Sequence, residues 1–168
     1  MKIVGRAWRF GDNISTDDII PGRFFHLRGN IKELARHTFE DLRPEFSKVV
    51  RPGDIIVAGE NFGIGSSREH AVHVLKALGI SALIAKSFSR IFFRNAINVG
   101  IPAIIADTSR IDEGDILEAY LDEGIIINIT KNLKISFKPL PQFLICILKA
   151  GGLIEYVKRY GLNLVRSL

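Results

Sequence analysis

The sequence has few of the residues that build metal centres or disulfides. It contains one cysteine, Cys146, among 168 residues. A single thiol cannot form an internal disulfide, and alone it cannot hold a zinc ion or an iron–sulfur cluster. Since Cys146 lies in the apolar run 143–148, we expect it to be a small core residue and expect this chain to hold no metal.

Long apolar stretches are also missing. No run reaches the roughly 18 uncharged apolar residues that a membrane-spanning helix needs. The first six residues continue into a strand pattern without the apolar region and cleavage site of a signal peptide. We therefore expect a cytoplasmic protein with no membrane partner.

The formal net charge is +5, and the basic residues are scattered along the chain instead of clustered. A scattered excess of this size suits a small anionic ligand or an acidic partner, and we expect no nucleic-acid binding. Hydrophobic residues make up 47% of the chain, which is ordinary globular composition at this length. We expect residues 1–168 to form a single domain.

Hydrophobic patterning predicts an α/β protein. Apolar strands alternate with amphipathic helices over residues 54–106, which is typical of parallel strands joined by helical crossovers, and three β-rich runs then suggest an antiparallel meander. The predicted strands cover residues 3–10, 54–58, 81–86, 103–106, 115–120, 124–130 and 133–138. The predicted helices cover residues 31–42, 88–99, 141–149 and 153–160, and a further helix follows the loop at 61–70, with its apolar face from Ala71 to Leu78.

The loop at residues 61–70 carries the strongest functional signal. Gly63 and Gly65 follow a predicted strand, and Arg68 lies in the expected first turn of a helix. Glycines allow close approach to the backbone, a helix start offers unpaired N–H groups, and arginine can bind a carboxylate with two parallel hydrogen bonds. The pattern predicts a carboxylate or phosphate site. The structural alternative is a capping box, because Ser66 and Glu69 have that spacing.

Two earlier segments mix polar and apolar residues. In residues 14–22 we expect a turn held by side-chain-to-backbone hydrogen bonds, and the alternative is that Asp17 places a carboxylate at a strand edge for chemistry. Residues 23–30 are expected to form a loop with aromatic, basic and glycine residues. We expect His37 and His73 to lie on the surfaces of helices, and His70 to pack near the loop at 61–70.

Three segments together resemble one family. They are Ser15-Thr16-Asp17, the run NFGIGSSREHA at residues 61–71, and the run KSFSRIFFRNAINVG at residues 86–100. The combination is similar to the small subunits of isopropylmalate isomerase (3-isopropylmalate dehydratase) and of homoaconitase, in the aconitase superfamily. The resemblance covers nearly the whole chain. It implies a swivelling β/β/α domain, with a mixed sheet and flanking helices, that closes over a large subunit holding a [4Fe–4S] cluster.

The resemblance also implies an activity and roles for residues. The expected enzyme is a hydro-lyase that isomerises 2- and 3-isopropylmalate by dehydration and rehydration, in leucine biosynthesis, and acts only with the large subunit in a heteromer. Ser66 would be the catalytic base that takes the α-proton. Arg68, Ser67 and Asp17 would bind the substrate.

Substrate choice is implied for one segment. In this family the loop after Pro21-Gly22 sets specificity, and isopropylmalate enzymes tend to place apolar residues there. Arg28 instead resembles the arginine of aconitase and homoaconitase loops, and would bind a third carboxylate of a tricarboxylic acid. Alternatively, Arg28 faces solvent or pairs with Glu33, and apolar neighbours line a pocket for an isopropyl group. The specificity segment consists of Phe24, Phe25, His26 and Leu27.

A non-enzymatic function is the other alternative. A glycine-rich loop with an arginine can also serve a regulatory module that binds a carboxylate or phosphate without transforming it. The presence of a cluster-binding partner subunit would discriminate between the two.

Overall fold

The protein is described here by a computed structural model that covers residues 1–161. Seven strands form one mixed sheet in the order β4-β3-β2-β1-β5-β6-β7. The strands are β1 (Lys2–Arg9), β2 (Ile55–Ala58), β3 (Ala82–Ala85), β4 (Ala103–Ile105), β5 (Ile116–Tyr120), β6 (Ile125–Asn128) and β7 (Leu133–Ser136).

β1 divides the sheet into two halves. It pairs in parallel with β2, with Ala7 opposite Ile55, and antiparallel with β5, with Ile3 opposite Ala119. β2, β3 and β4 continue the parallel half, and β5, β6 and β7 form an antiparallel meander. The predicted fold class, α/β with a mixed sheet, is confirmed.

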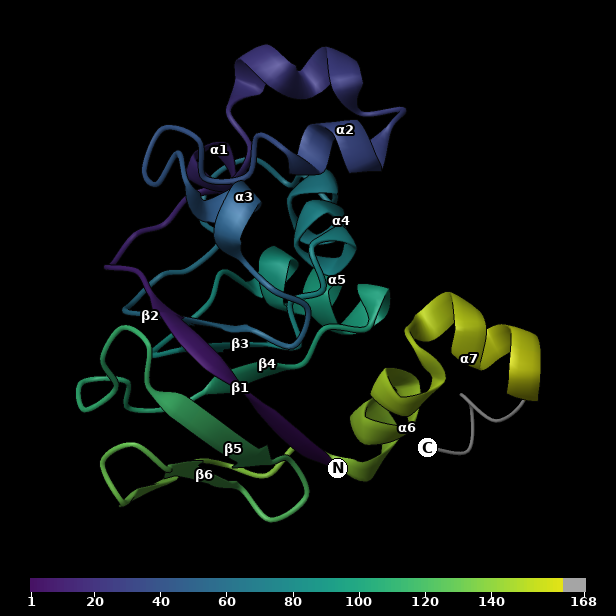
Figure 1. Cartoon of the computed structure of the whole chain (residues 1–168). Helices are drawn as coiled ribbons and strands as arrows, with labels where there is room; N and C mark the ends of the chain where they lie inside the picture. The colour runs from purple at the N-terminus through teal and green to yellow at the C-terminus, as the bar shows by residue number, and fades with distance from the viewer. Residues whose placement is uncertain (162–168) are drawn as a thin grey trace.

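The helices cover mainly the parallel half of the sheet. In Figure 1, α1 to α5 lie together above that half, the meander lies below, and α6 and α7 lie to the side, near the N-terminus. Within residues 1–161, no helix is long and apolar enough to cross a membrane. The helices are α1 (Thr16–Ile19), the 3₁₀ helix η1 (Gly22–Leu27), α2 (Ile31–Ala35), α3 (Phe46–Val49), α4 (His70–Ala77), α5 (Arg90–Val99), α6 (Gln142–Ala150) and α7 (Leu153–Tyr160).

The two halves of the sheet follow different sequence patterns. Every residue of β2 and β3 is buried, as expected for parallel strands that are covered on both faces. In β5, buried Leu117 and Ala119 alternate with more exposed neighbours, as expected for a strand with one face towards solvent. The parallel strands expected within residues 54–106 and the antiparallel meander expected after them are both present.

The predicted helix at 31–42 is wrong in its length. α2 ends at Ala35, and turns follow because Phe39 adopts a positive φ of 57°. The Phe39 ring is fully buried and stacks on Phe10, with ring centroids 4.2 Å apart, and its N–H donates to the carbonyl of Ile19 at 2.9 Å. Burial of this ring overrides the helical periodicity of the segment.

Segments 14–22 and 23–30 are also more regular than predicted. The first contains α1, which begins with a capping box in which Ser15 and Asp18 exchange side-chain-to-backbone hydrogen bonds. The second contains η1, whose backbone bonds span three residues.

Asp54 is a buried carboxylate that joins β1 to the turn before β2. Its Oδ2 accepts hydrogen bonds from Trp8 Nε1 (2.7 Å), Arg51 N (2.9 Å) and Arg6 Nη2 (3.1 Å). Burial alone would raise the pKa of Asp54, but these donors outweigh it and lower the pKa below the ordinary value. The ionised form therefore stabilises the fold at pH values above about 4, and this contribution is lost as pH falls through the lowered pKa.

Replacing Asp54 by Asn keeps the shape and removes the charge. We expect Asp54→Asn to lower the free energy of unfolding at pH 7 by about 1.5–3 kcal/mol, because hydrogen bonds to a charged acceptor are lost. The difference from the wild type should shrink below about pH 4, since the Asp54 carboxylate of the unfolded wild-type chain then takes up a proton while the folded chain, whose Asp54 pKa is lower, still resists protonation. Urea unfolding at pH 7 and pH 3 measures both effects.

Glu123→Gln is the control, because this exposed carboxylate makes no side-chain hydrogen bond or ion pair within the described part of the chain. A constant difference between Asp54→Asn and the wild type from pH 7 to pH 3 would contradict the role of the charge.

Candidate active site

Three loops meet at the carboxyl ends of β1, β2 and β3. Beyond the strands, Thr16 N donates to the carbonyl of Ile64 (2.8 Å), and Phe62 N donates to the carbonyl of Ser87 (3.0 Å). These bonds extend the parallel pairing into the loops. Ligands of open α/β sheets bind at this edge, so the fold brings the three motifs of the sequence to a plausible location for a site.

The glycines of the 61–70 loop are required for different reasons. Gly63 has a φ of 80°, and a Cβ there would lie 2.1 Å from Cγ of Phe92 on α5. At this position glycine is therefore needed because the backbone lies against the Phe92 ring, and not because a ligand approaches it. Gly65, with a φ of 98°, has more room, and its conformation is what favours glycine.

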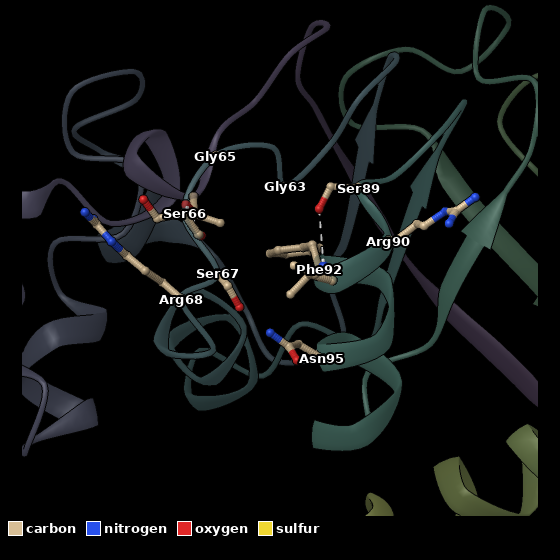
Figure 2. A pocket seen from close by; sticks show the side chains of 11 residues that line it. Gly63, Gly65, Ser66, Ser67, Arg68, Ser89, Arg90, Phe92 and Asn95 are labelled. Carbon is tan, nitrogen blue, oxygen red and sulfur yellow. Dashed lines mark hydrogen bonds between the residues drawn. The ribbon is translucent and has the colours of Figure 1, made fainter.

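The loop borders a cavity of about 330 Å³. Ser66, Ser67 and Arg68 line it together (Figure 2). Ser67 and Asn95 point towards the same space in this view, whereas Arg90 extends away from the serines. The lining residues are Thr16, Gly63, Gly65, Ser66, Ser67, Arg68, Ser89, Arg90, Ile91, Phe92 and Asn95.

Ser66 is exposed and its backbone is fixed from both sides. Its carbonyl accepts hydrogen bonds from Thr16 Oγ1 (2.9 Å) and from Arg68 N (2.8 Å). The second bond closes a tight turn, so that α4 begins only at His70 with Glu69 as its N-cap residue and no side-chain cap. The capping box proposed for Ser66 and Glu69 is therefore wrong, and Arg68 precedes the helix instead of lying in its first turn.

Arg68 is held by a residue far away in the sequence. Its Nη1 donates to Asp17 Oδ1 at 3.2 Å, and the same oxygen accepts from Gly22 N at 2.9 Å. The bond to Gly22 is a side-chain-to-backbone bond of the kind expected for the turn at residues 14–22. A role of Asp17 in the chemistry stays a prediction. The side chains of Asp17 and Arg68 are 67% and 28% exposed.

The specificity segment reaches Arg68 through one ring. Cζ of Arg68 lies 5.7 Å from the centre of the Phe25 ring, and Cζ of Arg28 lies 4.7 Å from it. His70 meets the same ring edge-on at 5.6 Å. Among the described residues Arg28 forms no ion pair with Glu33, which pairs with Arg36 instead. Both arginines thus stand at one aromatic ring.

The rest of that segment faces elsewhere. Phe24 stacks on His37, Leu27 is partly buried against the core, and His26 is exposed with Nδ1 3.0 Å from the carbonyl of Arg23. None of residues 22–28 lines the cavity at the serines. His37 does not lie on a helix as expected, because α2 ends two residues earlier.

Two residues of the site were not assigned a role from the sequence. Thr16 is buried, and its hydroxyl anchors the Ser66 carbonyl. Asn95 lines the cavity from α5. A sequence signal existed for both, since Thr16 lies in the Ser15-Thr16-Asp17 motif and Asn95 is a polar residue on a largely apolar helix. The sequence alone does not predict that Thr16 binds the Ser66 carbonyl or that Asn95 lines the same cavity.

Residues 37–107 match the model of the aconitase C-terminal domain. The chain is 61% identical over 161 residues to 3-isopropylmalate dehydratase small subunit 2 of Archaeoglobus fulgidus, covering 96% of this chain and 98% of that protein. It is 54% identical over 160 residues to 3-isopropylmalate dehydratase small subunit 1 of Thermotoga maritima, covering 95% and 96%.

A solved structure agrees with these relatives. The crystal structure of 3-isopropylmalate dehydratase from Methanocaldococcus jannaschii superposes with a TM-score of 0.91 at 48% identity, over 100% of both chains. Identity of this level over the whole length, together with the same fold, shows that the chain belongs to the family of 3-isopropylmalate dehydratase small subunits, which carry the aconitase C-terminal domain fold.

Proposed function

We propose that this chain is the small subunit of a hydro-lyase that interconverts 2- and 3-isopropylmalate in leucine biosynthesis. The observation that carries the proposal is the convergence of Ser66, Arg68 and Asp17 at the carboxyl edge of the sheet, in a chain whose relatives are named 3-isopropylmalate dehydratase small subunits. An anion-binding module without catalysis could use the same arginine with Ser66 as a hydrogen-bond donor, and it is the names of the relatives that favour the enzyme.

Arg68 binds a carboxylate of the substrate in this proposal. A guanidinium has five N–H donors in a planar fork, and the only hydrogen bond that the Arg68 side chain donates within the described residues uses Nη1. Asp17 orients the group while leaving donors for a ligand. Removal of a proton beside a carboxylate places negative charge on that carboxylate, and a positioned guanidinium stabilises it.

Ser66 takes the α-proton. A serine hydroxyl is a weak base until it is deprotonated, so the site has to favour the alkoxide. Arg68 lines the same cavity, and a nearby positive charge favours the ionised form of a hydroxyl. The double anchoring of the Ser66 carbonyl fixes the backbone, which limits the positions that the hydroxyl can take.

The residues of this chain do not fit an iron–sulfur cluster. Such clusters need several thiolates, whereas the chain has only Cys146, which is partly buried against the core. Within residues 1–161 no three His, Cys, Asp or Glu side chains gather as a metal site. We propose that the [4Fe–4S] cluster belongs to a large subunit, and that the cavity at Ser66 faces that subunit in the assembled enzyme.

A second candidate is a homoaconitase-type enzyme that acts on a tricarboxylic acid. The observation that favours it is the position of Arg28, which shares the Phe25 ring with Arg68. Two guanidiniums at one ring could bind two carboxylates of the same substrate. Isopropylmalate stays the first candidate because the similar relatives carry that name.

The role of Ser66 is tested by Ser66→Ala. The substitution keeps the carbonyl that Thr16 binds, so we expect an intact loop, while turnover by the pair with the large subunit should fall by about 10²–10⁴-fold, as for loss of a general base. Absorbance of the unsaturated intermediate under anaerobic conditions measures turnover. Ser109→Ala, at an exposed turn, is the matched control. Equal turnover in Ser66→Ala and the wild type would exclude the base assignment.

Arg28→Ala separates the two substrate classes. If Arg28 binds a third carboxylate, kcat/KM for citrate- or homocitrate-type acids should fall by about 10²-fold, since a charged hydrogen bond is lost, and kcat/KM for isopropylmalate should hardly change. Steady-state kinetics with both substrates give the comparison. Arg36→Ala is the control, because that side chain is exposed and pairs with Glu33. Equal losses on both substrates would rule out a carboxylate clamp.

A further inference from the structure

The Phe24 ring is held outside the cavity by a stack. It lies on the imidazole of His37 with centroids 3.8 Å apart and an angle of 13° between the planes. Cζ of Arg23 lies 4.6 Å from the centre of the same ring. Aromatic and cation–π contacts of this geometry stabilise the position of a partly buried ring beyond what burial of its apolar surface contributes.

Both partners of Phe24 are themselves anchored. Nδ1 of His37 is hydrogen-bonded to Glu40 Oε2. Arg23 Nη1 and Nη2 bind Asp41 Oδ2 and Oδ1 at 2.8 and 2.6 Å. The hydrogen bonds from Arg23 lower the pKa of the Asp41 carboxyl, so it is ionised at neutral pH.

The anchors belong to a rigid part of the chain. Glu40 and Asp41 follow Phe39, whose ring is fully buried and whose backbone binds the carbonyl of Ile19. The turn at residues 36–42 is therefore fixed to the core, and it holds Phe24 on one side of η1. Phe25 is the next residue, and its ring makes cation–π contacts with the guanidinium groups of both Arg68 and Arg28.

We propose that His37 and the Arg23–Asp41 pair are positioning residues for substrate choice. They hold Phe24 in place. Because Phe24 and Phe25 both belong to the 3₁₀ helix η1 and Arg28 follows it, this also fixes the positions of Phe25 and Arg28 relative to Arg68. This inference rests on the proposed function, since it concerns the side of the same site that discriminates between substrates. It places determinants of specificity on residues that do not contact the substrate.

The first test uses the isolated chain and needs no activity. In His37→Ala we expect amide hydrogen exchange at Phe24, Arg28 and Asn30 to become about two- to tenfold faster, the loss that corresponds to one aromatic pair. These amides donate to the carbonyls of Pro21, Phe25 and Leu27 within the segment. His37→Phe keeps an aromatic ring for the stack and should restore slow exchange.

His73→Ala is the matched control, because His73 also faces a glutamate one turn away, Glu69, and has no aromatic ring stacked on it within residues 1–161. Thermal unfolding confirms that each variant is folded. The proposal is overturned if exchange in His37→Ala matches the wild type, or if His37→Phe exchanges as fast as His37→Ala.

The second test uses the enzyme assembled with its large subunit. His37→Ala and Asp41→Asn should each change the ratio of kcat/KM between isopropylmalate and a tricarboxylic acid by about two- to tenfold, mainly through KM. His37→Phe should keep the wild-type ratio. An unchanged ratio in both variants overturns the inference. If the wild-type pair turns over none of these acids, the proposed function fails, while the exchange experiment still decides whether the stack holds the segment.

Discussion

The site depends on hydrogen bonds that continue the parallel sheet beyond the ends of its strands. Thr16 N binds the carbonyl of Ile64, and the Thr16 hydroxyl binds the carbonyl of Ser66. One buried residue thus fixes two points of the glycine-rich loop. β1 pairs with β5 over residues 2–6 and with β2 over residues 7–9. The strand before the Thr16 loop is therefore paired along its length, and the hydrogen bonds of Thr16 tie Ser66 to the sheet.

The sequence predicts the framework well because each half of the sheet has its own pattern. Residues 55–58 and 82–85 are continuous apolar runs and form buried parallel strands, and the glycine turns at 114 and 124 delimit β5. Prediction from the local sequence pattern fails where a contact with a residue distant in sequence determines the backbone conformation. Phe39 ends the helical run because its ring is buried against Phe10, which lies 29 residues earlier in the numbering of the chain.

The same distinction holds for the site. The residue types at 61–70 indicate an anion site, and the structure brings Ser66, Ser67 and Arg68 to one cavity. Two features escape local reasoning. The capping-box spacing at Ser66 is not used, because the turn at Arg68 delays α4, and a capping box occurs at Ser15 instead. The rings that pack on Phe24 and Phe25 are those of His37 and His70, which come from two other segments, and spacing within a motif contains no information about such contacts.

The ion pair between Arg68 and Asp17 bears on the carboxylate-binding role that we propose for Arg68. An arginine with no anion nearby would be free to adopt many rotamers, and a ligand would have to order it. Asp17 limits this freedom through a single 3.2 Å bond, in a pair whose acidic side chain is 67% exposed. Such an exposed bond contributes at most about 1 kcal/mol. In the role that we propose for Arg68, a substrate carboxylate can therefore compete with or join Asp17 at low cost, and the guanidinium is already in place when the substrate arrives.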